Sequence, residues 1–516
     1  MFWRPSLQSE RSSPSCLISL PGGLGVSGVA RFAVRLANGL ADRGGRGGLL
    51  LHAANPSIPR LQLPIDARVT VVDCGDLPPI EDAEPGRFVD RYSTAIEDLG
   101  GGSPVARVLG QHAGPFAVAA ELTRTRGDAI RAIGVAHSDN GYDTRVLGHY
   151  EPMLHAMVGV SKMLTTELSA IAPNRASAIE RVAYGVEVPS RVAAREPIGG
   201  RPLRLLYAGR LEHRQKRVLA LPALSHELER RGIAHEMTII GDGPAIDDLR
   251  VACSDASSIT IRPPATPEAL AEQLDAHDAF VLPSRFEGLS IAMLEALAHG
   301  CIPVVAPSRS GTAEAVLPGR TGEIASVTPD DEEPRVGIAL ADAIETLRRR
   351  DLDELSKRCH AHALASFSIE HHVDRWSSLI GRVAEDTPRP WPTNRPVSFE
   401  AASGTGSVPA DAAQRFARVV DQLGGAPIAL HGAGAHTRAL ADTARHANVV
   451  CITDDDRQRH GETMLGVPIV DPSEAATLGA THVVISTHLH EAEVWRRRAV
   501  YERQGLTVHR LYADGP

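Results

Sequence analysis

Short apolar runs rich in β-branched residues alternate with helix-like periodic segments along almost the whole chain. The runs "CLISL", "GLLLHAA" and "VTVVDC" belong to a first series, and "LRLLYAG", "HEMTIIG" and "DAFVLPS" belong to a second series that begins near residue 200. Alternation of this kind is typical of βαβ units, in which helices join parallel strands. The pattern therefore predicts an α/β protein with two Rossmann-like, doubly wound domains.

A third, shorter α/β segment follows a stretch rich in proline, serine and glycine, "EDTPRPWPTNRPVSFEAASGTGSVP". Such a composition is typical of a linker. Beyond it, "PIALHGAGAHTRAL" predicts a strand, a glycine turn and a helix. We expect a first domain over 1–195, a second over 196–386 that ends in a helix crossing back onto the first, a linker over 387–410, and an additional Rossmann-like domain over 411–516.

Charge and composition narrow the classes of function. The formal net charge of -9 argues against nonspecific binding of nucleic acid, which needs a basic surface. No apolar run approaches the roughly 20 residues that span a bilayer. The six cysteines are scattered without a CxxC pair, so we expect neither a zinc site nor a disulfide framework. These features favour a cytoplasmic protein, and they leave peripheral contact with the inner membrane face and the oligomeric state open.

Two glycine-containing loops of the second domain follow strands, at the positions where open α/β sheets bind ligands. In "YAGRLEHRQKR", Gly209 and Arg210 come directly after a strand and Lys216 follows six residues later. In "IIGDGPAIDDL", Gly241 and Gly243 permit a tight turn before a helix. Cationic side chains beside unpaired backbone amides meet the requirements of a diphosphate.

A third loop, "FEGLSIAMLEALAHG", holds two acids in a segment that otherwise predicts a small apolar helix. If Ser290 caps that helix, Glu295 falls on the same face as Ile291 and Leu294. A buried carboxylate needs a hydrogen-bonding partner, and one placed a turn into the helix can accept both hydroxyls of a ribose. Glu287, in the turn before the helix, is placed to bind another polyol such as a donor sugar.

"EGLSIAMLE" matches the E-x7-E motif, and together with "GRLEHRQK" and "GDGP" it resembles the retaining glycosyltransferases of family four, which have the GT-B fold. The resemblance covers roughly residues 15–386, and the three motifs occur in the family's order. It implies that Arg210 and Lys216 neutralise the donor diphosphate. It also implies that Glu287 contacts the donor sugar and Glu295 the nucleoside ribose.

Other residues of these loops have smaller implied roles. The resemblance implies that the backbone at Gly288, Leu289 and Ser290 helps to cradle the donor sugar and phosphates. Arg214 and Arg217, which flank Lys216 in the first loop, are expected to be solvated.

The first domain resembles the same family more loosely. In "LPGGLGVSG", Gly25 and Gly28 are the candidates for a close approach of backbone to the donor phosphate or the acceptor. "IGVAHSDNGYD" puts His137 just after a strand, where similar enzymes place a histidine facing the cleft near the donor sugar.

The implied reaction is transfer of a sugar from a nucleotide-diphosphate donor to an acceptor hydroxyl on a glycan, a lipid-linked acceptor or a small molecule, with retention of anomeric configuration. His137, Glu287, Arg210 and Lys216 form the expected catalytic set. No metal or other cofactor is required, because these cations and a helix dipole stabilise the departing diphosphate. A nucleotide-sugar epimerase and a non-catalytic nucleotide-sugar-binding protein on the same fold are the alternatives, and a third places the main chemistry in the C-terminal domain.

The third domain has a separate candidate site. Gly432 and Gly434 follow a strand in "GAGAHT", which lacks the third glycine of the dinucleotide fingerprint. Asp454 lies about 20 residues further on, where a Rossmann unit commonly places the acid that binds a ribose. The run "TDDDR" also matches a DxD metal site, but its position favours the ribose interpretation. The segment resembles the small nucleotide-binding domains fused to sugar-modifying enzymes, and a nucleotide, a dinucleotide or no ligand all remain open.

Overall fold

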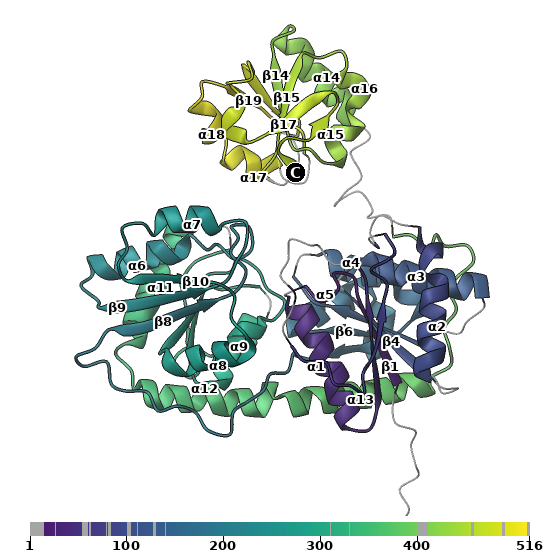
Figure 1. The fold of residues 1–516 in the computed structure, drawn as a ribbon, viewed down its shortest axis with the longest axis vertical. Helices are drawn as coiled ribbons and strands as arrows, with labels where there is room; N and C mark the ends of the chain where they lie inside the picture. The colour runs from purple at the N-terminus through teal and green to yellow at the C-terminus, as the bar shows by residue number, and fades with distance from the viewer. Residues whose placement is uncertain are drawn as a thin grey trace, which may run out of the picture. The chain divides into compact units, whose positions relative to one another are not determined.

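The computed structural model describes residues 15–512, except for 26, 54–59, 61–62, 79, 81–83, 101–104, 111, 127–130, 140, 310, 330, 400–410, 456–458 and 488–490. The chain divides into two compact units, one that ends at Phe399 and one that begins at Glu400. The first unit contains two parallel sheets and the second unit one largely parallel sheet, each with connecting helices, as the alternating pattern predicts (Figure 1). Among the described residues, no helix is both long and apolar enough to cross a membrane.

The first unit begins with a seven-stranded parallel sheet in the order β3-β2-β1-β4-β5-β6-β7. Its strands are β1 (Ser15–Leu20), β2 (Arg46–Leu51), β3 (Thr70–Asp73), β4 (Val105–Gly110), β5 (Arg131–Ala136), β6 (Leu154–Gly159) and β7 (Ile179–Arg181). The helices that connect them are α1 (Gly28–Asp42), α2 (Val89–Gly100), α3 (Ala113–Arg126), α4 (Tyr142–Tyr150) and α5 (Lys162–Ile171). Continuous burial of β1, β4 and β6 is what a parallel sheet covered on both faces requires.

A second parallel sheet in the same unit has the order β10-β9-β8-β11-β12-β13. Its strands are β8 (Leu203–Ala208), β9 (His235–Ile240), β10 (Ile259–Arg262), β11 (Ala279–Leu282), β12 (Ile302–Val305) and β13 (Glu323–Ile324). Its helices are α6 (Ala220–Arg230), α7 (Ile246–Ala252), α8 (Pro267–Ala276), α9 (Ile291–Ala298), α10 (Thr312–Ala315), α11 (Glu333–Leu347) and α12 (Leu352–Phe367). In both sheets the strand order reverses beside the first strand, which leaves a crevice at the carboxyl ends of the strands.

The chain passes between the two domains twice, and the two crossings are hydrogen-bonded to each other. The Val186 amide donates to the Phe367 carbonyl and the Ile369 amide donates to the Val186 carbonyl, both at 2.9 Å. Helix α13 (Ile369–Glu385) then lies against the first domain, where Trp376 is completely buried and its ring lies 5.5 Å from that of Phe32 on α1. Helix α13 therefore returns from the end of the second domain to pack on α1.

Part of the expected linker packs onto the first domain. Trp391 is 3% exposed, the Tyr150 hydroxyl donates to the Val397 carbonyl at 2.7 Å, and His155 Nε2 lies 3.0 Å from the Thr387 carbonyl. Residues 387–399 thus belong to the first unit, whereas 400–410 lie outside the described residues.

The second unit contains a six-stranded sheet in the order β16-β17-β15-β14-β18-β19, parallel except for β16. Its strands are β14 (Ile428–His431), β15 (Val449–Thr453), β16 (Thr463–Met464), β17 (Val467–Val470), β18 (His482–Ile485) and β19 (Thr507–His509). Its helices are α14 (Ala412–Leu423), α15 (Ala435–Ala439), α16 (Ala441–Ala444), α17 (Glu491–Arg496) and α18 (Ala499–Glu502). The additional Rossmann-like domain is therefore present, and its strand order reverses between β14 and β18.

Candidate active site

The amino ends of α1 and α9 face each other across the two domains of the first unit. Each helix is capped by a serine, because Ser27 Oγ accepts from the Ala30 amide at 3.1 Å and Ser290 Oγ accepts from the Met293 amide at 3.4 Å. A Cβ at Gly28 would lie 3.5 Å from the Ile291 side chain, so the two amino ends are in contact. Both ends carry the positive pole of a helix dipole, which favours an anion near them.

Glu295 lies on the buried side of α9, as its spacing predicts, and is 8% exposed. Its carboxylate is bound by two arginines of α1. Arg31 Nη1 lies 2.9 Å from both carboxylate oxygens, and Arg35 Nη2 lies 2.9 Å from Oε1. The sequence analysis did not anticipate this pair. A usable signal was present, because two arginines four residues apart interrupt an otherwise apolar helix and face the same way.

Lys216 and Glu287 meet at the carboxyl ends of β8 and β11. The Lys216 ammonium lies 2.5 Å from Glu287 Oε1, and the Glu287 residue is 8% exposed. The Gln215 amide donates to the Phe286 carbonyl at 3.1 Å, which joins the two loops. Arg210 lies at the rim, with a side chain 59% exposed and Nη2 3.5 Å from Gln215 Oε1. The structure therefore brings the expected cation and acid together and leaves Arg210 open to solvent.

Two of the predicted glycines allow close backbone contacts. A Cβ at Gly288 would lie 1.9 Å from the His137 carbonyl oxygen, so the loop before α9 rests directly on the loop after β5. A Cβ at Gly241 would lie 2.0 Å from the Gly209 carbonyl oxygen. Side chains at either position would force these loops apart. Leu289, between Gly288 and the Ser290 cap, is 3% exposed.

Gly243 lies in the same loop as Gly241, and Gly25 lies in the loop between β1 and α1. Gly243 would bring a Cβ to 2.3 Å from the Leu211 carbonyl oxygen, and Gly25 forms an isolated antiparallel bridge with Arg60. These contacts account for both positions structurally, and a direct role in binding the donor stays a prediction.

His137 lies against the loop before α9, and it is 8% exposed. Its Nδ1 lies 2.7 Å from the Tyr184 hydroxyl, and the two rings are stacked with centroids 6.0 Å apart. Burial lowers the pKa of His137 to about 3, so the imidazole is neutral near pH 7. The residue can orient a ligand by a hydrogen bond, but it carries no charge. Tyr184 was not predicted, since nothing in "RVAYGVE" marks it as a partner.

Arg217 corrects an expectation, because it is completely buried whereas the sequence analysis placed it in solvent. Its guanidinium donates to the carbonyls of Pro283 at 2.7 Å, Ser284 at 3.1 Å and Asp331 at 3.2 Å. Burial lowers the pKa of Arg217 to about 10. The side chain thereby fixes the segment that leads into Glu287. Arg214 is exposed, as expected.

A second ion pair joins the domains beside His137. Arg309, in the loop after β12, binds the Asp139 carboxylate, whose side chain is 1% exposed. Asp139 Oδ2 has no hydrogen-bond partner within the described residues, and burial raises the pKa of Asp139. Nowhere in the described ranges is a group of three or more His, Cys, Asp or Glu residues placed to hold a metal ion.

The predicted site of the third domain lies where its strand order reverses. Gly432 follows β14 with φ +108°, and a Cβ there would lie 3.2 Å from the Ser486 carbonyl oxygen just after β18. Asp454 Oδ2 accepts from the Ala433 amide at 2.6 Å, so the acid holds the glycine loop. A nucleotide bound by Gly432, Gly434 and Asp454 stays a prediction.

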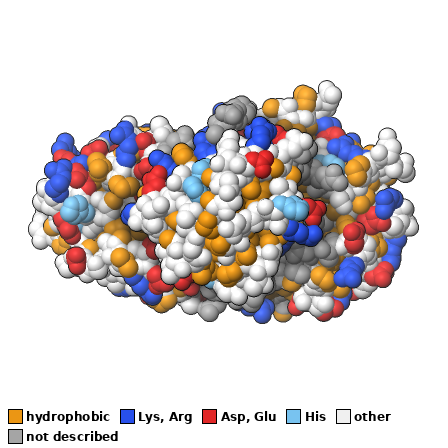
Figure 2. Space-filling view, turned by 90° about the horizontal axis from the view of Figure 1, so that it is seen from above, with side chains coloured by type: hydrophobic (Ala, Val, Ile, Leu, Met, Phe, Trp, Pro, Cys, Tyr) orange, Lys and Arg blue, Asp and Glu red, His pale blue; other side chains and the backbone are white. Residues whose placement is uncertain are grey.

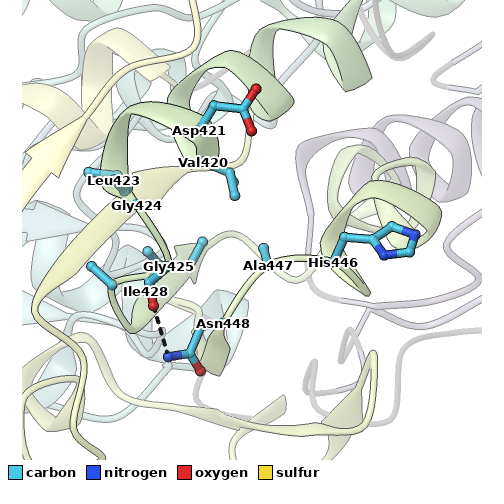
Figure 3. Close-up of a pocket in the computed structure, with 10 residues that line it drawn as sticks. Val420, Asp421, Leu423, Gly424, Gly425, Ile428, His446, Ala447 and Asn448 are labelled. Carbon is cyan, nitrogen blue, oxygen red and sulfur yellow. Dashed lines mark hydrogen bonds between the residues drawn. The ribbon is translucent and has the colours of Figure 1, made fainter.

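A cavity of about 280 Å³ lies at the opposite, amino ends of the strands, around the first residues of β14 and β15 (Figure 3). Its lining includes Gly424, Gly425, Ile428, His446 and Asn448. Its position differs from the crevice in which doubly wound sheets bind nucleotides.

Comparison with solved structures defines the class of the first unit. A sucrose-phosphate synthase from Thermosynechococcus elongatus superposes with a TM-score of 0.55 at 16% identity, over 72% of this chain and 99% of that chain. HepE from Anabaena, in complex with UDP and glucose, superposes with a TM-score of 0.54 at 12% identity, over 71% of this chain and 99% of that chain. The first unit therefore has the GT-B architecture, which confirms the predicted fold.

Sequence comparison finds similarity within the second domain. The family model "Glycosyl transferases group 1" matches residues 202–350, which lie within the second domain. A GDP-mannose-dependent alpha-(1-6)-phosphatidylinositol monomannoside mannosyltransferase of Mycolicibacterium smegmatis is 34% identical over 175 residues, or 32% of this chain and 45% of that protein. An alpha-D-kanosaminyltransferase of Streptomyces kanamyceticus is 33% identical over 202 residues, or 37% of this chain and 49% of that protein. The chain thus matches less than half the length of these curated relatives.

Proposed function

We propose that the protein transfers a sugar from a nucleotide-diphosphate sugar to an acceptor hydroxyl with retention of anomeric configuration. The observation that carries this proposal is the convergence of Lys216, Glu287 and Glu295 at two facing helix amino ends in a GT-B fold. The bound UDP and glucose of HepE, and the GDP-mannose in the name of the mycobacterial relative, support a nucleotide sugar as the donor.

In this proposal the positive charge acts on the leaving group. Lys216, Arg210 and the amino end of α9 stabilise the negative charge that grows on the departing diphosphate, and one such preorganised donor is typically worth about 3–4 kcal/mol. Arg210 is free to move toward the donor because it is solvent-exposed. The backbone of Gly288 and Ser290 completes the cradle.

The acids and the histidine orient the donor. Glu287 accepts from hydroxyls of the donor sugar, and Glu295 accepts from the nucleoside ribose. Neutral His137 lies beneath the Gly288 loop and orients the sugar by a hydrogen bond. Retention follows if the acceptor attacks the face that the diphosphate leaves, with a leaving-group oxygen helping to remove the acceptor proton. The acceptor is a hydroxyl of a glycan, a lipid-linked acceptor or a small molecule.

A thermal-shift screen of UDP- and GDP-linked sugars tests the proposal. A true donor at 100 times its Kd is expected to stabilise the first unit by about 2.7 kcal/mol. Glu295→Ala should remove most of that shift, whereas the matched control Glu272→Ala, on an exposed position of α8, should retain it.

Turnover then separates the alternatives. Consumption of donor that depends on an added acceptor, with an unchanged anomeric configuration in the product, is the expected result. Conversion of the donor in the absence of an acceptor would indicate an epimerase. Tight binding without turnover over a broad panel of acceptors would indicate a non-catalytic nucleotide-sugar-binding protein.

A further inference from the structure

The two arginines that bind Glu295 are anchored differently. Arg35 is 8% exposed, and it also lies 2.6 Å from Glu187 Oε2 and 3.4 Å from the Gly185 carbonyl. Arg31 is more exposed, at 19% of its side chain, and within the described residues its guanidinium bonds Glu295 alone. Arg35 is therefore held in place whatever Glu295 binds, whereas Arg31 can leave without breaking another contact.

The acceptor capacity of Glu295 limits what it can hold at one time. An ionised carboxylate offers about four lone-pair positions for hydrogen bonds. Arg31 occupies one on each oxygen and Arg35 occupies another. Two ribose hydroxyls need two positions, so a ribose and both arginines exceed the capacity. Departure of Arg31 leaves enough room for the ribose, while Arg35 still compensates the buried charge.

A released Arg31 has a suitable anion nearby. It lies in the first turn of α1, whose amino end touches that of α9 through Gly28 and Ile291. This is where the proposed function places the donor diphosphate. A guanidinium binds phosphate oxygens in a two-pronged geometry that lysine does not match.

We propose that Arg31 is a further donor-binding residue that exchanges partners: it pairs with Glu295 in the ligand-free protein and with the diphosphate once the ribose occupies Glu295. This inference rests on the proposed function. Because Arg31 belongs to the first domain and Glu295 to the second, the exchange couples nucleotide binding to the contact between the domains. It also brings a first-domain cation to the leaving group.

Under this proposal, substitution of Arg31 weakens the binding of nucleoside diphosphates and strengthens the binding of nucleosides. That contrast is the test. Calorimetry would measure the affinities of uridine, guanosine, UDP and GDP for the full chain and for Arg31→Gln. Loss of a guanidinium–phosphate contact should weaken binding of the recognised diphosphate by about 10-fold. Removal of the competitor for Glu295 should strengthen binding of the matching nucleoside by about 3-fold or more.

Arg31→Lys and Arg124→Gln complete the set. The lysine variant keeps the charge but loses the two-pronged geometry, so its affinity for the diphosphate should fall between the wild type and Arg31→Gln. Arg124, an exposed residue of α3, serves as the control, and its variant should match the wild type. Thermal unfolding of each variant shows whether it is folded before its affinities are compared.

The other outcomes overturn the inference. A fall in both affinities of Arg31→Gln would assign Arg31 a structural role, and a rise in both would make it only a competitor of the ribose. No change in either affinity would leave it without a role in binding. If the wild type binds neither UDP nor GDP, the proposed function itself fails, and that result is distinct from the other three.

Discussion

The second and third domains both place their candidate sites at the carboxyl ends of the strands of similar sheets, yet the chemistry of the two sites differs. In the second domain, Glu287 and Glu295 are buried; Glu287 pairs with the partly buried Lys216, and Glu295 pairs with two arginines of the first domain. In the third domain, the Tyr501 hydroxyl lies 2.6 Å from both His431 Nδ1 and Thr453 Oγ1, in a buried polar network. Fold position thus indicates where a ligand binds, and the side chains determine which ligand it is.

The acidic residues of the two candidate sites also have different bonding partners. Glu295 reaches across to another domain, whereas Asp454 accepts from Ala433 in its own glycine loop. The 280 Å³ cavity of the third domain lies at the amino ends of its strands, where Asn448 donates to the Gly425 carbonyl at 3.2 Å (Figure 3). Over the face of the molecule drawn in Figure 2, basic and acidic side chains are interspersed.

The largest expected effect is on transfer. Lys216→Ala should lower kcat by a factor of about 10² to 10³, because it removes a preorganised cation from the leaving group. Lys357→Ala is the control, since Lys357 is one of only three lysines and forms an exposed pair with Asp353. Steady-state rates with a saturating donor measure both. A similar loss in the two variants, or none in Lys216→Ala, would break the distinction between the crevice and the surface.

Arg217 should have the next largest effect, this time on stability. Arg217→Ala leaves several buried carbonyls without a donor, which should reduce the free energy of unfolding by about 3 kcal/mol. Arg217→Gly should cost about 1 kcal/mol less, because the backbone there has φ +47°, which alanine adopts poorly. Urea denaturation measures both, with Arg214→Ala as the exposed control. Equal stability of the Arg217 and Arg214 variants would contradict the buried role.

Acid should destabilise the first unit. Burial lowers the pKa of His137 to about 3, from 6.5, so the unfolded chain binds more protons than the folded one below pH 6.5. The stability contribution is complete above pH 6.5 and is lost as the pH falls, by about 2 kcal/mol at pH 5. His52 and His372 act in the same direction, because burial lowers the pKa of each to about 4.

Denaturation of His137→Gln at pH 5 and pH 7 checks this sign. The variant should lose less stability on acidification than the wild type, whereas His226→Gln, at an exposed position, should lose as much. An identical pH response in all three proteins would show that His137 is not buried in a neutral form.

The smallest effect is expected from the third domain. Asp454→Asn should weaken the bond to the Ala433 amide and reduce the stability of that domain by about 1 kcal/mol. Nucleotide-sugar binding and transfer should not change. A chain that ends at Phe399, where the first unit ends, should also retain both. Loss of transfer in the shortened chain would show that the third domain is needed for catalysis and would contradict the assignment of the reaction to the first unit.

The sequence predicts local features well and contacts between domains poorly. The alternation of strands and helices predicts all three sheets, and the helical spacing puts Glu295 on the buried face of α9. The arginines that bind it come from more than 250 residues earlier in the chain, as the sequence separations of 264 and 260 show. No local periodicity records such a distant contact.

Two further misses have the same origin. Arg217 was expected in solvent because its neighbours are polar, but its acceptors are backbone carbonyls of other loops, which a sequence does not mark. Residues 387–399 have the composition of a linker, yet Trp391 is buried among residues of the first domain. An aromatic residue in a proline-rich stretch is the signal that such a segment packs.

The paired crossings at Val186 and Ser368 restrict how the first unit can open. Because the two connecting segments are hydrogen-bonded to each other, they form a single hinge about which the two domains of the first unit can rotate. Arg35 donates to the carbonyl of Gly185, which adjoins this hinge at Val186. Its contact with Glu295 should therefore change little when the domains rotate. A rotation about this hinge would displace groups farther from it by larger distances.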